Sequence, residues 1–118
     1  MGTGGFFLRK LRAGLFERPT GFVWVEEGKL AGSGFPASRN QLRWLRNQRI
    51  NTILTLTEKP IPEEWLEGMD LEVRHIPMKD HLPPDKASLS EAAKFLEQSL
   101  GTERVVLVHC LAGEGRTG

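Results

Sequence analysis

The residues whose chemistry is easiest to interpret form one run near the end of the chain. Cys110 follows a short apolar stretch, and Arg116 stands six positions after Cys110, with Gly113 and Gly115 between them. Glycines let the backbone curl until several N–H groups face one point, which makes an anion site. A guanidinium at this spacing can bind two oxygens of one tetrahedral oxyanion. The run therefore predicts a phosphate-binding loop, whose backbone amides come from Leu111, Ala112, Gly113, Glu114, Gly115 and Arg116.

Cys110 is the predicted nucleophile of this loop. Free cysteine titrates near ~8.5, whereas cysteines beside cationic groups and helix N-termini titrate at roughly 3.5–7.5. A lone cysteine is ordinarily a small buried hydrophobe, but these neighbours favour a thiolate in line with a bound phosphorus, which is the arrangement for covalent phosphoryl transfer. We expect His109 to order the loop and favour the thiolate, and Thr117 to place a hydroxyl near the sulfur. Alternatively, His109 is a structural histidine whose hydrogen bonds are satisfied at the end of a strand, and Thr117 is an ordinary residue at the N-terminus of a helix.

Composition narrows the class of protein. The chain has 118 residues, 39% of them hydrophobic and 26% charged, with a net charge of +1. This fits one soluble domain and gives no reason to expect nucleic acid as a partner. A single cysteine excludes an internal disulfide framework, and three scattered histidines, of which His75 and His81 are expected to be structural or exposed, predict no metal site. We expect no cofactor, because a thiolate needs none for phosphoryl transfer.

Residues 1–21 are predicted to form an N-terminal arm that packs on the domain. The arm holds a short apolar run followed by basic residues, too short for the core of a signal peptide and far below the roughly 20 residues of a membrane span. We therefore expect no stable membrane association. The default location is the cytoplasm, which keeps a reactive thiol reduced, and we expect a monomer.

Strands and helices alternate along the rest of the chain. The continuous apolar runs at 50–56 and 105–108 predict strands buried on both faces. This alternation predicts an α/β fold with a central, mostly parallel sheet flanked by helices, and Cys110 at the carboxyl end of a strand, where such sheets bind ligands. The predicted strands are 22–25, 28–32, 50–56, 71–76 and 105–108, with helices beginning near Ser38, near Pro62 and near Ser88.

Two helices have predicted caps and buried faces. Ser38 with Gln41, and Ser88 with Glu91, fit capping boxes, and Gly101 fits the end of the second helix. The residues placed on the buried faces are Leu42 and Leu45 in the first helix, and Leu89, Ala93, Leu96 and Leu100 in the second.

The run His109-Cys110-x5-Arg116-Thr117-Gly118 is the signature of the protein tyrosine phosphatases, and the chain from Phe22 to Gly118 resembles their small atypical dual-specificity members. The resemblance implies a catalytic domain over 22–118 with the cysteine-phosphatase fold. It also implies that Asp80, thirty residues before the cysteine, is the general acid. Asp85 is the competitor for this role, although its position before a helix suits a capping carboxylate. Glu58 is expected to orient Arg116, or else to be a solvated loop charge.

The resemblance implies hydrolysis of phosphomonoesters through a phosphocysteine intermediate. The expected substrate is phosphotyrosine, and also phosphoserine or phosphothreonine, on a phosphorylated protein partner. Two alternatives stay open: a phosphoinositide phosphatase, although Glu114 in the loop would repel a polyanion, and a non-catalytic phosphate-binding module.

The family continues beyond its signature loop with helices that cover one face of the sheet. Because this chain ends at Gly118, we expect a domain that lacks its C-terminal helices, and a 118-residue chain that aggregates or loosens by itself.

Overall fold

A five-stranded sheet forms the centre of the structure, a computed structural model that describes residues 18–79 and 83–110. The strands are β1 (Val23–Glu26), β2 (Leu30–Ser33), β3 (Thr52–Thr55), β4 (Glu72–His75) and β5 (Val106–His109). They lie side by side in the order β1-β2-β5-β3-β4. β1 and β2 pair antiparallel, whereas every other neighbouring pair is parallel. The predicted α/β fold with a mostly parallel sheet is confirmed.

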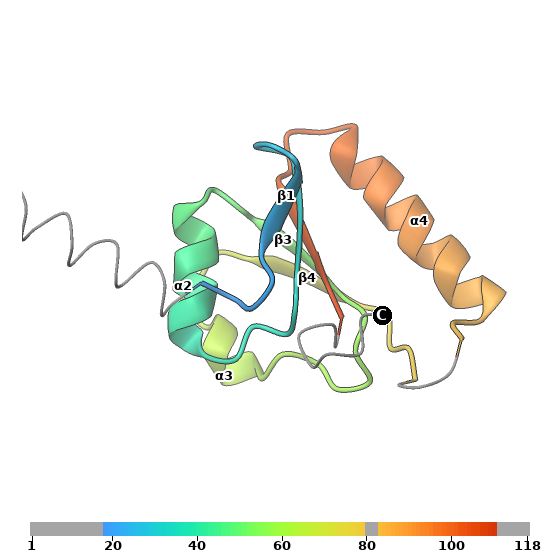
Figure 1. Cartoon of the computed structure of the whole chain (residues 1–118), viewed down its shortest axis with the longest axis horizontal. Helices are drawn as coiled ribbons and strands as arrows, with labels where there is room; N and C mark the ends of the chain where they lie inside the picture. Colours follow the sequence, from blue (N-terminus) through green and yellow to red (C-terminus); the bar gives the residue numbers. More distant parts are fainter. Residues whose placement is uncertain (1–17, 80–82, 111–118) are drawn as a thin grey trace, which may run out of the picture.

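Helices lie against both faces of the sheet (Figure 1). The helices α2 (Arg39–Asn47) and α3 (Glu63–Leu66) lie on one face, and α4 (Lys86–Leu100) lies on the other. None of the helices in the described residues is long and apolar enough to cross a membrane. Two apolar clusters result: Ala31, Leu42, Leu45, Ile50, Ile53, Ile61, Met69 and Leu107 in one, and Leu54, Ile76, Ala92 and Phe95 in the other.

The central strands β3 and β5 form the most deeply buried part of the sheet. All four residues of β3 are buried, and so are three of the four in β5. The pattern agrees with the continuous runs in the sequence, because a parallel strand between two layers of helices needs apolar or satisfied side chains on both faces. β5 leads directly to Cys110, and β3 lies beside it.

Helix α2 begins where the sequence predicts. The Ser38 hydroxyl accepts from the Gln41 N–H at 3.2 Å, and the Gln41 side chain accepts from the Ala37 N–H at 2.7 Å. The predicted pair Leu42 and Leu45 is fully buried against the sheet. The capping interaction and the apolar face together fix how this helix lies on the strands.

Helix α4 differs from its prediction in its start and in its buried face. It begins at Lys86, because the Asp85 carboxylate and not Ser88 caps it. Gly101 ends it as predicted. The buried residues are Ala92, Phe95 and Ser99, whereas Leu89 is 49% exposed. The buried face is therefore displaced by one residue from the predicted face, which left out the large Phe95 ring and the polar Ser99. Ser99 can be buried because its polar groups are hydrogen-bonded.

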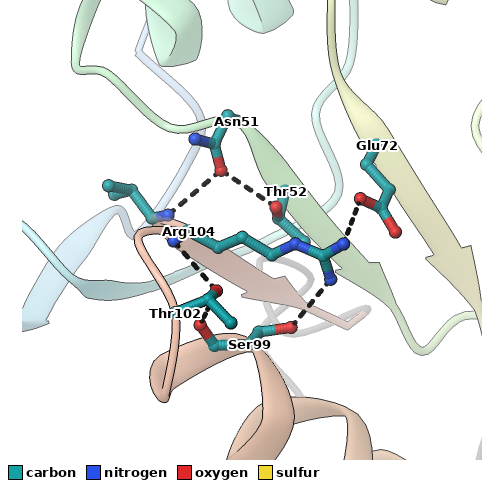
Figure 2. Close-up of polar contacts among 7 residues, drawn as sticks. Asn51, Thr52, Glu72, Ser99, Thr102 and Arg104 are labelled. Atoms are coloured by element: carbon teal, nitrogen blue, oxygen red, sulfur yellow. Dashed lines mark hydrogen bonds and ion pairs between the residues drawn. The ribbon is translucent and has the colours of Figure 1, made fainter.

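Polar contacts tie the amino ends of β3 and β5 together, at the edge of the sheet away from the cysteine (Figure 2). Asn51 Oδ1 accepts from the backbone N–H of Val105 at 3.0 Å and from the Thr52 hydroxyl at 2.9 Å. The bond to Val105 helps to fix the register of β3 against β5, because Asn51 and Val105 immediately precede the two strands, and the bond from Thr52 holds the Asn51 side chain in place.

A second set of contacts connects the end of α4 to β4 across the same edge. Arg104 Nη2 lies 2.8 Å from Glu72 Oε1, and Arg104 Nη1 donates to Ser99 Oγ at 3.5 Å (Figure 2). The Thr102 hydroxyl donates to the Ser99 carbonyl at 2.7 Å. These bonds account for the burial of a serine on the inner face of α4.

Candidate active site

The carboxyl ends of four parallel strands meet at one end of the sheet. In the strand register His109 of β5 lies between Ser33 of β2 and Thr55 of β3, and Thr55 in turn lies beside His75 of β4. Cys110 follows β5 directly, so it stands at the edge of the central strand. Parallel sheets bind ligands at this edge because the chain leaves the strands there and loops can converge.

Cys110 is exposed and carries a free thiol. It is the last residue described before the predicted phosphate loop. The other loop residues lie outside the described residues, as does the predicted general acid Asp80. The roles of Arg116 and Thr117, and of the amides contributed by Leu111, Ala112, Gly113, Glu114 and Gly115, therefore stay predictions.

His109 lies directly behind the cysteine and is only 1% exposed. Its Nε2 lies 2.9 Å from the hydroxyl of Thr55. The ring of Phe35 meets the imidazole edge to face, with centroids 5.2 Å apart and planes at 84°. Burial disfavours the charged imidazolium and lowers the pKa of His109 to about 4. His109 is therefore neutral at pH 7 and held on two sides.

The segment after β3 is ordered by a histidine and a threonine. His75 Nε2 donates to the Thr57 carbonyl at 2.8 Å, and the Thr57 hydroxyl donates to the Lys59 carbonyl at 2.6 Å. Glu58 is exposed between them. His75 thus has the structural role expected of it, and Glu58 lies on the same edge as Cys110, while its predicted partner Arg116 is outside the described residues.

Asp85 caps helix α4. Its Oδ1 accepts from the Ser88 N–H at 2.7 Å. This backbone hydrogen bond favours the carboxylate and lowers the pKa of Asp85. A carboxylate held ionised at a helix N-terminus is poorly suited to donate a proton, so the geometry agrees with the capping role.

The sequence reasoning missed Thr55 and Phe35 as neighbours of His109. A signal for Thr55 was present, since it is a polar residue inside an apolar, fully buried strand. A buried hydroxyl needs a hydrogen-bond partner, which a neighbouring parallel strand can supply. Within 18–79 and 83–110 no group of three or more His, Cys, Asp or Glu residues could hold a metal ion.

A protein-family model matches most of this chain. The family is described as the Swiss Army Knife protein, DSP-PTPase phosphatase domain (PTP-SAK), and the match covers residues 19–118. The matched range includes the described strands and helices as well as the signature run after β5.

Individual relatives agree with this match. The dual specificity protein phosphatase Mpk3 of Drosophila melanogaster is 35% identical over 74 residues, which are 62% of this chain and 18% of the fly protein. The core catalytic domain of the PP-IP phosphatase SIW14 from S. cerevisiae superposes with a TM-score of 0.69 at 21% identity, covering 85% of this chain and 61% of that one. Tk-PTP in its active form gives 0.63 at 26% identity, covering 72% and 58%. The chain thus spans less than two thirds of the length of each.

Proposed function

The chain belongs to the dual-specificity and protein tyrosine phosphatase family, and from this premise we propose that it hydrolyses phosphomonoesters with Cys110 as the nucleophile. The observation that carries the proposal is the exposed thiol at the carboxyl end of the central strand, directly after a buried and neutral histidine. The spacing of Cys110 and Arg116 supports it, because one loop of that size surrounds one tetrahedral oxyanion.

The reaction proceeds in two displacements at phosphorus. In the first, the Cys110 thiolate attacks, a P–S bond forms, the P–O bond to the leaving group breaks, and Asp80 protonates the leaving oxygen. In the second, Asp80 takes a proton from water, the water oxygen attacks phosphorus, and the P–S bond breaks. The products are an alcohol or phenol and inorganic phosphate, and the thiolate and the acid are restored.

The loop binds the transferred group in both steps. The Arg116 guanidinium and the amides of 111–116 hold the equatorial oxygens, where negative charge is concentrated in the transition state. Thr117 places its hydroxyl near the sulfur and eases its departure in the second step. Glu58 orients Arg116 through a carboxylate–guanidinium pair, for which its exposed position on the Cys110 edge is suitable.

The proposed substrates are phosphotyrosine and, secondarily, phosphoserine or phosphothreonine in proteins. The similarity to a dual specificity protein phosphatase favours this class. The likeness to the PP-IP phosphatase SIW14 is a likeness of fold, and Glu114 in the loop opposes a substrate with several phosphates. We propose that the protein acts in the cytoplasm, where its thiol stays reduced.

The test uses the fraction of the 118-residue chain that is monomeric and melts cooperatively, and measures its hydrolysis of an aryl phosphate, a phosphotyrosine peptide, a phosphoserine peptide and a short-chain phosphoinositide, all in the presence of EDTA. We expect turnover of the aryl phosphate and the phosphotyrosine peptide, competition by vanadate, and at most a trace of activity in Cys110→Ser. Binding of phosphate without turnover would favour a non-catalytic module. A preference for the phosphoinositide would replace the protein substrate, and activity that survives in Cys110→Ser would contradict the mechanism.

A further inference from the structure

A hydroxyl and an imidazole join the ends of two neighbouring strands behind the cysteine. Thr55 Oγ1 lies 2.9 Å from His109 Nε2, and Thr55 is 0% exposed. The two residues are direct partners in the parallel register of β3 and β5. Because both side chains are buried from water, each depends on the other for this hydrogen bond. The pairing of β3 with β5 holds the two side chains next to each other.

The hydroxyl can decide which nitrogen of the imidazole carries the proton. Because burial lowers the pKa of His109 to about 4, the ring at pH 7 has one proton for two nitrogens. A threonine hydroxyl can donate or accept, and the nitrogen that it does not contact takes the complementary state.

The remaining nitrogen, Nδ1, lies on the side of the ring nearer to its own backbone. It is buried and has no partner at ordinary hydrogen-bond geometry among the described residues. An interaction with the Cys110 backbone raises the pKa of His109 against the larger effect of burial, which is how an acceptor acts on a protonated ring nitrogen. The interaction with the Cys110 backbone favours a proton on Nδ1, and no described donor contacts this nitrogen to oppose it.

We propose that Thr55 is a positioning residue for Cys110: its hydroxyl donates to His109 Nε2 and keeps the imidazole proton on Nδ1, facing the Cys110 backbone. The inference rests on the proposed function, in which Cys110 is the nucleophile. A donor held toward that backbone orders the start of the phosphate loop and favours the thiolate over the thiol.

Among the described residues, a second histidine and an aromatic ring also act on His109. His75, at the end of β4, lowers the pKa of His109 by repulsion, to a smaller extent than burial does. On another side lies the uncharged ring of Phe35. Exchanging Thr55 for valine adds no charge and leaves both of these groups in place, so a changed ionisation of Cys110 would come through the hydroxyl.

The experiment measures the ionisation of Cys110 without turnover. Cys110 is the only cysteine of the 118-residue chain, so the rate of its alkylation by iodoacetamide against pH reports its thiolate alone. In Thr55→Val we expect the midpoint of this profile to rise by about half a unit to one unit, which slows alkylation by about 3–10-fold at pH values well below the midpoint. Thr55→Ser keeps the hydroxyl and should keep the wild-type profile.

The matched control is Thr52→Val, at the other end of the same buried strand, whose hydroxyl donates to Asn51 Oδ1. It should leave the profile unchanged. An unshifted profile in Thr55→Val, or an equal shift in Thr52→Val, overturns the proposal.

A second measurement needs no variant. The ¹⁵N and ¹H signals of His109 in the wild-type chain should show the proton on Nδ1, and a proton on Nε2 overturns the proposal even if Thr55→Val does not fold. Neither readout depends on turnover. A wild-type chain that fails to hydrolyse an aryl phosphate therefore sinks the proposed function separately.

Discussion

At the scale of single residues, we expect different roles for the two carboxylates near the proposed general-acid loop. Asp85 accepts a hydrogen bond from Ser88 at the start of α4, whereas Asp80 precedes Pro83 and Pro84 as in the family pattern. We predict that Asp80→Asn slows turnover of substrates with poor leaving groups by roughly 10²–10⁴, because the leaving oxygen then departs without a proton. Substrates with very good leaving groups should lose less. The measurement is kcat on a pair of aryl phosphates that differ in leaving-group acidity.

Asp85→Asn is the matched control for this prediction. Asparagine is as good an N-cap as aspartate, so the helix and the turnover should both be preserved. Equal losses for both substrates in Asp80→Asn, or a larger loss from Asp85→Asn, would move the role of general acid away from Asp80.

The buried histidine links stability to pH. His109 has an unfolded pKa near 6.5 and a folded pKa of about 4, so between these values the unfolded chain binds a proton that the folded chain does not. Its contribution to stability is complete above pH 6.5 and is lost as the pH falls toward 4. From pH 7 to pH 5 we predict that the free energy of unfolding falls by about 2 kcal/mol through this residue. Urea unfolding of wild type and His109→Gln at both pH values measures it, and an equal fall in both proteins would disprove the assignment.

At the scale of elements, the sequence predicted each helix only in part: the start and buried face of α2 and the end of α4 were correct, whereas the start and buried face of α4 were wrong. The start of α2 was predictable from Ser38 and Gln41, because side-chain caps leave a local pattern. Its end has no glycine to mark it. The chain turns there through Arg49, whose φ of 72° lies in the left-handed region. The rotated face of α4 could not be read from spacing, because the contacts that bury Ser99 come from residues after the helix.

The end of α2 gives a stability prediction. The Arg49 N–H donates to the Arg46 carbonyl at 2.8 Å and the Ile50 N–H to the Leu45 carbonyl at 3.1 Å, a Schellman motif with arginine in the place of glycine. We predict that Arg49→Gly stabilises the protein by about 0.5–1 kcal/mol, because glycine adopts this conformation without a clash. Chemical denaturation measures the change. Arg49→Ala, which keeps the strain, should give no gain, and equal stabilisation by alanine would show that the arginine side chain was the cause.

In the candidate site, too, features within one short stretch of sequence were predictable, whereas contacts between residues far apart in the sequence were not. The cysteine, the glycines and the arginine were predictable because they share one short run, and the strand before them was predictable from its apolar residues. The contact of Thr55 with His109 spans 54 positions, the same separation as that of Asn51 and Val105 at the other edge. Such contacts follow from the register of β3 against β5, which the sequence does not state. A slip of one residue would break both.

At the scale of the whole molecule, the two faces of the sheet are covered unequally. Trp24 of β1 packs against the cluster on the α2 side, so its neighbour Val23 points toward the face on which α4 lies, and Val25 follows at a bulge in the pairing of β1 with β2. These two valines are 58% and 69% exposed. In Figure 1 α4 stands at a distance from β1 on this side of the sheet. Among the described residues, the edge strand β1 therefore presents two apolar side chains to solvent.

This open face should make the 118-residue chain self-associate. Exposed apolar side chains on an edge strand favour contact with a second copy, because burying them removes apolar surface from water. Val23→Thr with Val25→Thr replaces one methyl group by a hydroxyl at each position and keeps a β-branched shape. With about 0.8 kcal/mol for each of four methyl groups between two copies, we predict that self-association weakens by roughly two-hundredfold. Sedimentation velocity over a range of concentrations measures it, with Leu89→Gln as the control, since Leu89 is exposed on α4 and not on the sheet. A double variant that associates like the wild type, or a control that weakens association equally, would show that a different surface brings the copies together.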